Sequence, residues 1–300
     1  MPTVEANGLT LAYEEHGDPA GPVMLMVMGL GVNLLFWPDE LVERFAASGF
    51  RVIRFDNRDV GLSTKLDHLG TPNVALAAIK FALHLPLKAR YFVEDMARDT
   101  LGFMDALGIE RAHVVGASMG GMIAQNLAAA DPQRVITLTS IMSTTGCRSL
   151  PQPMASARRA LLTSPAKPGD VEGATLRMMK VLRAIGSRTH PADEGYLRAM
   201  CERHVRRSSH APGVARQLVA VAGSGDRTQV VRRIKAPTLV IHGDEDPLLR
   251  PACGIATHEA IVAGGGLARL ELVKGMGHDL PMPLLPRIAE SIVNHCAPSS

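Results

Sequence analysis

Short apolar runs alternate with amphipathic stretches along the first part of the chain. Val23–Met28 is apolar throughout and is closed by Gly29, which is typical of a central strand covered on both faces. Pro38–Ser48 has apolar residues at helical spacing and stops at Gly49. Arg51–Phe55 is again strand-like. A strand, a helix and a strand in close succession predict a right-handed βαβ crossover, and therefore a parallel sheet.

The alternation continues toward the middle of the chain. Leu9–His16 reads as an exposed strand, and Asn73–Leu87 is an apolar stretch that could be an extra helix, packed or lining a pocket. The pattern then predicts helices at Val93–Leu107 and Met122–Ala130, and strands at Ala112–Val115 and Val135–Ile141.

The alternation breaks between about Gly146 and Arg233, where only helical segments are found, the clearest being Tyr196–Arg207 and Val214–Ala222. It resumes with a strand at Thr238–Ile241, a helix at Pro251–Val262, a strand at Ala268–Val273 and a helix at Pro283–His295. We therefore expect an α/β core from residues 1–145 and 234–300, with residues 146–233 inserted as a helical cap. The core should contain a mostly parallel central sheet flanked by helices.

The composition excludes only a few classes of function. Hydrophobic residues make up 46% and charged residues 20% of the 300 residues, which is ordinary for a globular protein of this length. The net charge of +3 is carried by scattered basic pairs, so no nucleic-acid partner is expected. No signal peptide or membrane-spanning run is seen, and the four cysteines form no Cys-x-x-Cys pair. These features favour a cytoplasmic protein with reduced thiols.

The strongest chemical signal is Gly116-x-Ser118-x-Gly120. A serine hydroxyl is a poor nucleophile unless a tight turn exposes it beside a base, and flanking glycines allow the backbone to approach closely. Here an apolar strand precedes the motif and a helix follows it, which is the context that the motif requires. The alternative is an ordinary glycine-rich turn between a strand and a helix.

A nucleophilic serine needs a base, and the base needs an acid to orient it. The loop after the strand Thr238–Ile241 carries three acidic residues, of which we select Asp246; Asp244 and Glu245 are assigned to the turn or to solvent. His278 follows the last strand in a glycine-rich loop and is the candidate base. The order serine, acid, histidine along the chain fits this arrangement.

The reaction also needs hydrogen-bond donors for the developing oxyanion. One candidate is the backbone N–H of Met119, at the start of the helix after the nucleophile. The second candidate is the N–H of Leu30, because glycines on both sides let its loop approach the substrate. The Leu30 loop could also be a simple glycine turn.

No metal or cofactor site is expected from the sequence. It contains no His-x-x-x-His, no cysteine pair and no phosphate-binding glycine loop after the first strand. Four methionines of the expected cap could line an apolar pocket, but core packing is the simpler interpretation; they are Met154, Met178, Met179 and Met200.

Together these motifs resemble those of the α/β-hydrolase superfamily. The resemblance rests on the segments Met28-Gly29-Leu30-Gly31, Asp56–Ser63, Gly116–Gly121, His242–Asp246 and Gly277-His278. Within the superfamily, the Met-Gly oxyanion loop and Trp37-Pro38-Asp39 are similar to those of small carboxylesterases close to aclacinomycin methylesterase. The resemblance implies that Arg58 and Asp59 hold their loop in place and are not catalytic.

The expected activity is therefore hydrolysis of a small-molecule carboxylic ester, an apolar one in view of the composition, through an acyl-enzyme on Ser118. Thioester, lactone, amide or C–C bond hydrolysis would use the same residues. A ligand receptor on the same fold is the alternative from another class. The natural substrate and the oligomeric state are left open by the sequence.

Overall fold

Eight strands form one sheet in the computed structural model, which describes residues 1–297. The strands are Thr3–Ala6 (β1), Leu9–His16 (β2), Val23–Val27 (β3), Arg51–Phe55 (β4), Ala112–Ala117 (β5), Val135–Ile141 (β6), Thr238–Gly243 (β7) and Ala268–Val273 (β8). Their order across the sheet is β1-β2-β4-β3-β5-β6-β7-β8. The pairs from β4 to β8 are parallel, whereas β1 pairs antiparallel with β2, and β2 with β4.

The parallel part of the sheet confirms the expected α/β fold. β3 lies between β4 and β5, and its apolar residues are buried on both faces of the sheet, Leu25 in one apolar cluster and Met26 in the other. β3 and β4 are adjacent and parallel, as the first strand–helix–strand pattern predicted. The carboxyl ends of β3, β5, β7 and β8 therefore meet at one edge of the sheet, which is where ligands bind in folds of this class.

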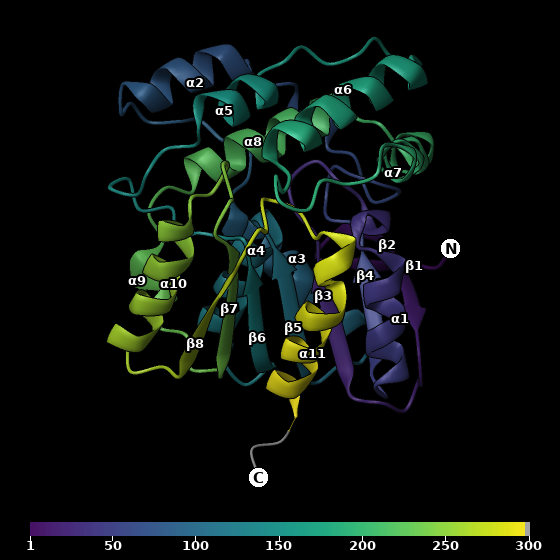
Figure 1. The fold of residues 1–300 in the computed structure, drawn as a ribbon, viewed down its shortest axis with the longest axis vertical. Helices are drawn as coiled ribbons and strands as arrows, with labels where there is room; N and C mark the ends of the chain where they lie inside the picture. Colours follow the sequence, from purple (N-terminus) through teal and green to yellow (C-terminus); the bar gives the residue numbers. More distant parts are fainter. Residues whose placement is uncertain (298–300) are drawn as a thin grey trace.

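Helices cover both faces of the sheet (Figure 1). The helices are Asp39–Ala47 (α1), Val74–Ala82 (α2), Val93–Ala106 (α3), Met119–Ala130 (α4), Ala155–Leu161 (α5), Val171–Ile185 (α6), Glu194–Arg207 (α7), Ala211–Gly223 (α8), Thr228–Val231 (α9), Pro251–Ala263 (α10) and Leu285–Cys296 (α11). Three short 3₁₀ helices occupy Leu34–Phe36, Asp67–Leu69 and Met282–Leu284.

Two apolar clusters hold these layers together. On one face, Phe45 of α1 and Ile292 of α11 pack with sheet residues such as Met26. On the other face, Phe103 of α3 and Ile123 of α4 pack with their own set of sheet residues. Each cluster combines one face of the sheet with the apolar stripes of amphipathic helices, as layered α/β folds require.

The chain between β6 and β7 is helical, as expected. In Figure 1 helices α5, α6, α7 and α8 lie across the carboxyl edge of the sheet, together with α2 from the first half of the chain. A small apolar cluster of Met179, Leu197 and Cys201 joins α6 to α7. Among the four methionines considered above, Met179 is thus a core residue, while Met154 is exposed.

Three features differ from the sequence-based expectation. The strand β1 was not predicted, although Asn7 and Gly8, with φ of 51° and 75°, form the tight turn that links it to β2. Helix α4 begins at Met119, earlier than expected, because it starts immediately after the nucleophile turn. Helix α6 is the longest of the inserted segment, and the sequence pattern did not single it out.

Candidate active site

Ser118 lies on a sharp turn between β5 and α4. Its backbone has φ of 56° and ψ of −119°, a conformation that costs a non-glycine residue about 1–3 kcal/mol. The turn is tight, since a Cβ atom on Gly116 would lie 2.3 Å from the Gly120 carbonyl oxygen. A Cβ atom on Gly120 would lie 2.0 Å from the Val27 oxygen. Both positions therefore require glycine, and the strain is concentrated at the serine.

The structure brings together the three side chains that the sequence selected. His278 Nε2 lies 2.9 Å from Ser118 Oγ, and His278 Nδ1 lies 2.7 Å from Asp246 Oδ2. Asp246 is on the loop after β7, and His278 is on the loop after β8. Because an ionised carboxylate only accepts hydrogen bonds, Nδ1 donates to Asp246 and leaves Nε2 free to accept the serine proton.

Asp246 is held as a carboxylate in a buried position. Its Oδ1 atom accepts hydrogen bonds from the backbone N–H groups of Leu248 at 2.8 Å and Leu249 at 2.9 Å. Burial by itself would raise the pKa of Asp246, but the adjacent His278 and His242 side chains outweigh it, so that the pKa is lowered from its ordinary value. Asp246 therefore remains ionised at neutral pH.

His242 is a second histidine beside this carboxylate, and its contact with Asp246 was not anticipated. Its side chain is fully buried, as expected for a residue that ends a strand. Nε2 lies 2.6 Å from the Leu249 carbonyl oxygen and 3.4 Å from Asp246 Oδ2. Both neighbours are acceptors, so Nε2 carries the proton. The i,i+4 spacing of His242 and Asp246 is the only sequence signal that pointed to this contact.

The two candidate oxyanion donors are Leu30, in the loop after β3, and Met119, at the start of α4. The N–H groups of Leu30 and Met119 donate no hydrogen bond to a protein acceptor within residues 1–297. A Cβ atom on Gly29 would lie 3.2 Å from Ser118 Cβ, so the backbone beside Leu30 passes close to the nucleophile. Met119 is the first residue of α4, where N–H groups lack helical partners and the helix dipole favours negative charge.

Gln217 braces the loop of Leu30 from the inserted segment, and sequence reasoning missed it. The side chain, from α8, is fully buried. Its Oε1 atom accepts the Gly31 N–H at 2.8 Å, and its Nε2 atom donates to the Arg58 carbonyl oxygen at 2.8 Å. No local pattern could have revealed a contact between residues so far apart along the chain.

The inserted segment also contacts the loop of the candidate base. The His278 N–H donates to the Ile185 carbonyl oxygen at 2.8 Å, at the end of α6. The Gly277 N–H donates to Ser187 Oγ at 2.7 Å, and that hydroxyl donates to Asp279 at 2.6 Å. Burial raises the pKa of Asp279, while its hydrogen bonds to Ser187 oppose the rise. Both loops that approach Ser118 are therefore tied to the inserted helices.

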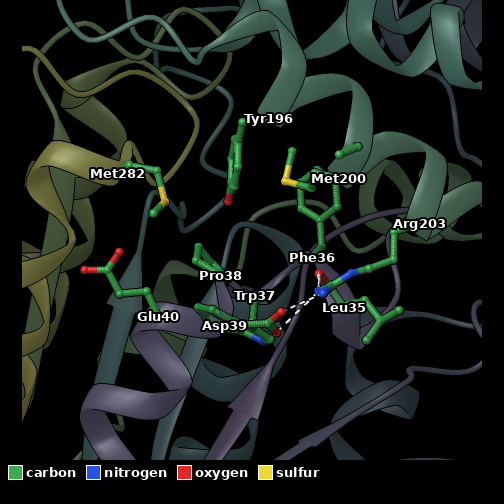
Figure 2. A pocket seen from close by; sticks show the side chains of 11 residues that line it. Leu35, Phe36, Trp37, Pro38, Asp39, Glu40, Tyr196, Met200, Arg203 and Met282 are labelled. Atoms are coloured by element: carbon green, nitrogen blue, oxygen red, sulfur yellow. Dashed lines mark hydrogen bonds and ion pairs between the residues drawn. The ribbon is translucent and has the colours of Figure 1, made fainter.

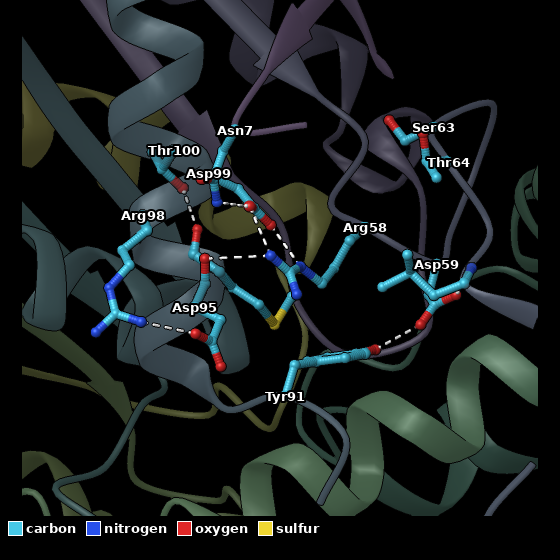
Figure 3. Close-up of polar contacts among 12 residues, drawn as sticks. Asn7, Arg58, Asp59, Ser63, Thr64, Tyr91, Asp95, Arg98, Asp99 and Thr100 are labelled. Atoms are coloured by element: carbon cyan, nitrogen blue, oxygen red, sulfur yellow. Dashed lines mark hydrogen bonds and ion pairs between the residues drawn. The ribbon is translucent and has the colours of Figure 1, made fainter. Parts of the chain in front are cut away.

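Arg58 and Asp59 make structural contacts, as the resemblance implied. Figure 3 shows the Arg58 guanidinium on Asp99, with distances of 2.5 and 2.6 Å, and the Tyr91 hydroxyl donating to Asp59 at 2.7 Å. Asp59 also receives two hydrogen bonds from Arg216 of α8, at 2.9 and 2.6 Å. These pairs fix the loop after β4 to α3 and to the inserted segment.

A groove of about 320 Å³ lies between the segment 35–40, helix α7 and Met282 (Figure 2). Its walls are mainly apolar and include Phe36, Trp37, Tyr196, Met200 and Met282. Ser118 and His278 do not line it; its residues come from the segment 35–40, from α7 and from Met282.

Two further findings concern the described part of the chain. Residues 1–297 contain no group of three or more His, Cys, Asp or Glu side chains arranged to hold a metal ion. Within the same residues, none of the helices combines the length and the apolar character needed to cross a bilayer.

Comparison with known proteins agrees with this geometry. The profile described as "alpha/beta hydrolase fold" matches residues 22–281, which span the strands β3 to β8, the serine turn and the loops of Asp246 and His278. This chain belongs to the α/β-hydrolase family. In this family the catalytic residues lie on loops at the carboxyl edge of the sheet, where Ser118, Asp246 and His278 lie in this chain.

Two methylesterases are among the similar members of this family. The chain is 31% identical to the rhodomycin D methylesterase DauP of Streptomyces sp. (strain C5), over 98% of each protein. It is 30% identical to the rhodomycin D methylesterase DnrP of Streptomyces peucetius, also over 98% of each.

Among solved structures, an enol-lactonase from Burkholderia xenovorans LB400 superposes with a TM-score of 0.74 at 25% identity, covering 98% of this chain and 99% of that one.

Proposed function

We propose that this protein is a serine hydrolase that cleaves carboxylic esters through an acyl-enzyme intermediate. The observation that carries the proposal is the chain of hydrogen bonds from Ser118 Oγ through His278 to Asp246. The strained turn that presents Ser118 supports the same conclusion, because such turns are a feature of nucleophilic serines in this family.

The proposed reaction starts with attack of Ser118 Oγ on the ester carbonyl carbon while His278 Nε2 accepts the hydroxyl proton. The tetrahedral oxyanion is stabilised by the N–H groups of Leu30 and Met119. His278 then donates its proton to the departing alcohol oxygen, and the acyl group stays on Ser118. In the second half, His278 takes a proton from water, the resulting hydroxide attacks the acyl carbon, and the acid is released as Ser118 Oγ regains its proton.

We propose an apolar ester with a small alcohol group as the substrate. The similarity to two methylesterases over nearly the full chain supports a methyl ester. The apolar groove that contains Trp37 and Tyr196 supports a bulky, apolar acid part. The likeness to the enol-lactonase makes a lactone, which is an internal ester, the second candidate.

We further infer that residues 146–233 act as a cap and that residues 1–145 and 234–300 form the catalytic core. The contacts of Ile185, Ser187 and Gln217 with the catalytic loops support a cap that shapes the site. A cytoplasmic location is also part of the proposal. It is supported by the four free cysteines, three of which are buried.

The test is steady-state hydrolysis of p-nitrophenyl esters from acetate to dodecanoate, of methyl esters of aromatic acids, and of lactones. Wild type is compared with Ser118→Ala, which should fold equally well, so equal thermal midpoints are the control. We expect turnover by wild type and a loss of at least about 10³-fold in kcat for the variant. Equal, slow rates for both proteins would contradict the assignment of Ser118 and the hydrolase itself.

A further inference from the structure

Helix α2 is an apolar helix that the protein itself covers only in part. Its nine residues are Val74 to Ala82, and none of them is buried. Ile79 is 57% exposed and Leu83, just after the helix, is 62% exposed. Leu76, Phe81 and Leu85 are also exposed. An isolated apolar residue on a surface is ordinary, but a continuous run of this kind marks an interaction surface.

Helix α5 extends this exposed surface. Met154 and Leu162, at its two ends, are exposed apolar side chains. The segment before α5 touches the end of the α2 segment, since Arg148 Nη1 lies 2.7 Å from His84 Nδ1. In Figure 1 both helices lie at the top of the protein, on the side away from the sheet. We call residues 72–92 and 147–169 together the apolar-basic face.

The charge of this face is one-sided. Its two segments contain no Asp or Glu and seven basic residues: Lys80, Lys88, Arg90, Arg148, Arg158, Arg159 and Lys167. The whole chain has 32 basic and 29 acidic residues, for a net charge of only +3, so the remainder of the chain is net negative. Exposed apolar side chains therefore coincide with the positively charged part of the molecule.

We propose that the apolar-basic face docks the protein on an anionic lipid surface. Apolar side chains with Lys and Arg among them are what a helix lying in a membrane interface requires, since the apolar groups enter the acyl boundary while the cations meet anionic headgroups. Helix α2 has nine residues and is far too short to span a bilayer, so it would lie in the interface. A protein partner would have to be acidic and apolar at once, and a second copy would bring the same positive charge against this face.

Docking in this orientation places the inserted helices against the lipid. α2 packs on α8, the helix that carries Gln217 and Arg216. In Figure 1 the sheet lies below α2 and α5, so a bilayer docked on these two helices would lie on the side away from the sheet. Docking through the apolar-basic face therefore requires no change in the catalytic residues, and the inference does not depend on the proposed function.

The experiment is co-sedimentation of the full-length protein with large vesicles of phosphatidylcholine containing 0 to 40% phosphatidylglycerol. We expect binding that rises with the phosphatidylglycerol fraction and weakens at high salt. The variant Leu76→Ser/Ile79→Ser/Leu83→Ser should bind at least about tenfold more weakly, because three apolar side chains are lost from the interface. Lys80→Gln/Lys88→Gln should weaken binding to anionic vesicles by about tenfold or more and leave any binding to neutral vesicles unchanged.

Leu267→Ser is the matched control, because Leu267 is 74% exposed and lies at the opposite end of the protein, before β8. It should bind like wild type. Hydrolysis of a water-soluble short ester, or an unchanged thermal midpoint if no ester is cleaved, shows that each variant is folded. The proposal is overturned if wild type does not bind vesicles, or if Leu76→Ser/Ile79→Ser/Leu83→Ser binds as well as wild type. It is also overturned if light scattering shows that wild type is a dimer and that the triple substitution at Leu76, Ile79 and Leu83 makes it a monomer.

Discussion

Replacing Gln217 with leucine tests whether the inserted segment controls the oxyanion site. Leucine has nearly the same volume but can neither accept the Gly31 N–H nor donate to the Arg58 carbonyl. The buried Arg58 carbonyl and the partly buried Gly31 N–H would then both lack partners, at a cost of up to about 1–3 kcal/mol each. We therefore expect the free energy of unfolding to fall by about 2–5 kcal/mol.

The effect on catalysis should exceed what lost stability explains. Removal of one oxyanion donor costs on the order of 10²–10³ in kcat. In Gln217→Leu the Leu30 N–H is still present but loses the support of the adjacent Gly31, so we expect kcat to fall by about 10–100-fold. KM should change little, because the oxyanion contact is strongest in the transition state.

The assay combines urea unfolding with steady-state kinetics on a p-nitrophenyl ester. Gln217→Glu keeps an acceptor for the Gly31 N–H and should recover most of kcat. Ile292→Ala, in the buried face of α11, should lose a similar 2–5 kcal/mol of stability, roughly as core truncations do, but retain kcat. If Gln217→Leu keeps kcat within about threefold of wild type, the Gly31 contact has no part in positioning the donor.

Three other substitutions test other parts of the structure. Asp246→Asn should lower kcat by about 10⁴ at neutral pH without unfolding the protein, because the amide no longer fixes the His278 tautomer; a loss below tenfold would exclude Asp246 as the orienting acid. Burial, assisted by Arg207, lowers the pKa of His204 to about 4, so protonation favours the unfolded chain. The free energy of unfolding should therefore have its full value above about pH 6.5 and fall by about 3 kcal/mol between pH 6.5 and pH 4. In urea unfolding, His204→Gln should lack this fall of about 3 kcal/mol over the same interval; parallel pH profiles for the two proteins would refute this. Arg216→Met leaves the buried Asp59 carboxylate without its main cation and should cost about 3–5 kcal/mol, measured by urea unfolding; a loss under 1 kcal/mol would show that Asp59 is neutral or solvated.

The sequence predicts most of the sheet and the three side chains that meet at its edge. β3 is apolar along its length and β5 is apolar apart from His113. A strand directly precedes each of the Ser118, Asp246 and His278 loops, so position along the chain is enough to place them at one edge. The strand β1 was missed although the Asn7-Gly8 turn signals it.

Other features were not available from local patterns. The contact of Gln217 with Gly31 depends on how the inserted helices pack over the edge of the sheet. Apolar periodicity also indicates only that a helix has a face that favours burial, and not whether residues of the same chain bury it. Helix α2 is the example, because its sequence is typical of a core helix and yet none of its residues is buried.

The ties between the inserted helices and the catalytic loops limit how this enzyme can be recombined with its relatives. Ile185 and Ser187 hold the loop of His278, and Gln217 holds the loop of Leu30. A chimera that exchanges residues 146–233 as one block must also supply an acceptor for the Gly31 N–H and partners for the Gly277 and His278 N–H groups. Single substitutions within residues 146–233 that leave these three contacts in place are therefore easier to accommodate than exchange of the whole segment.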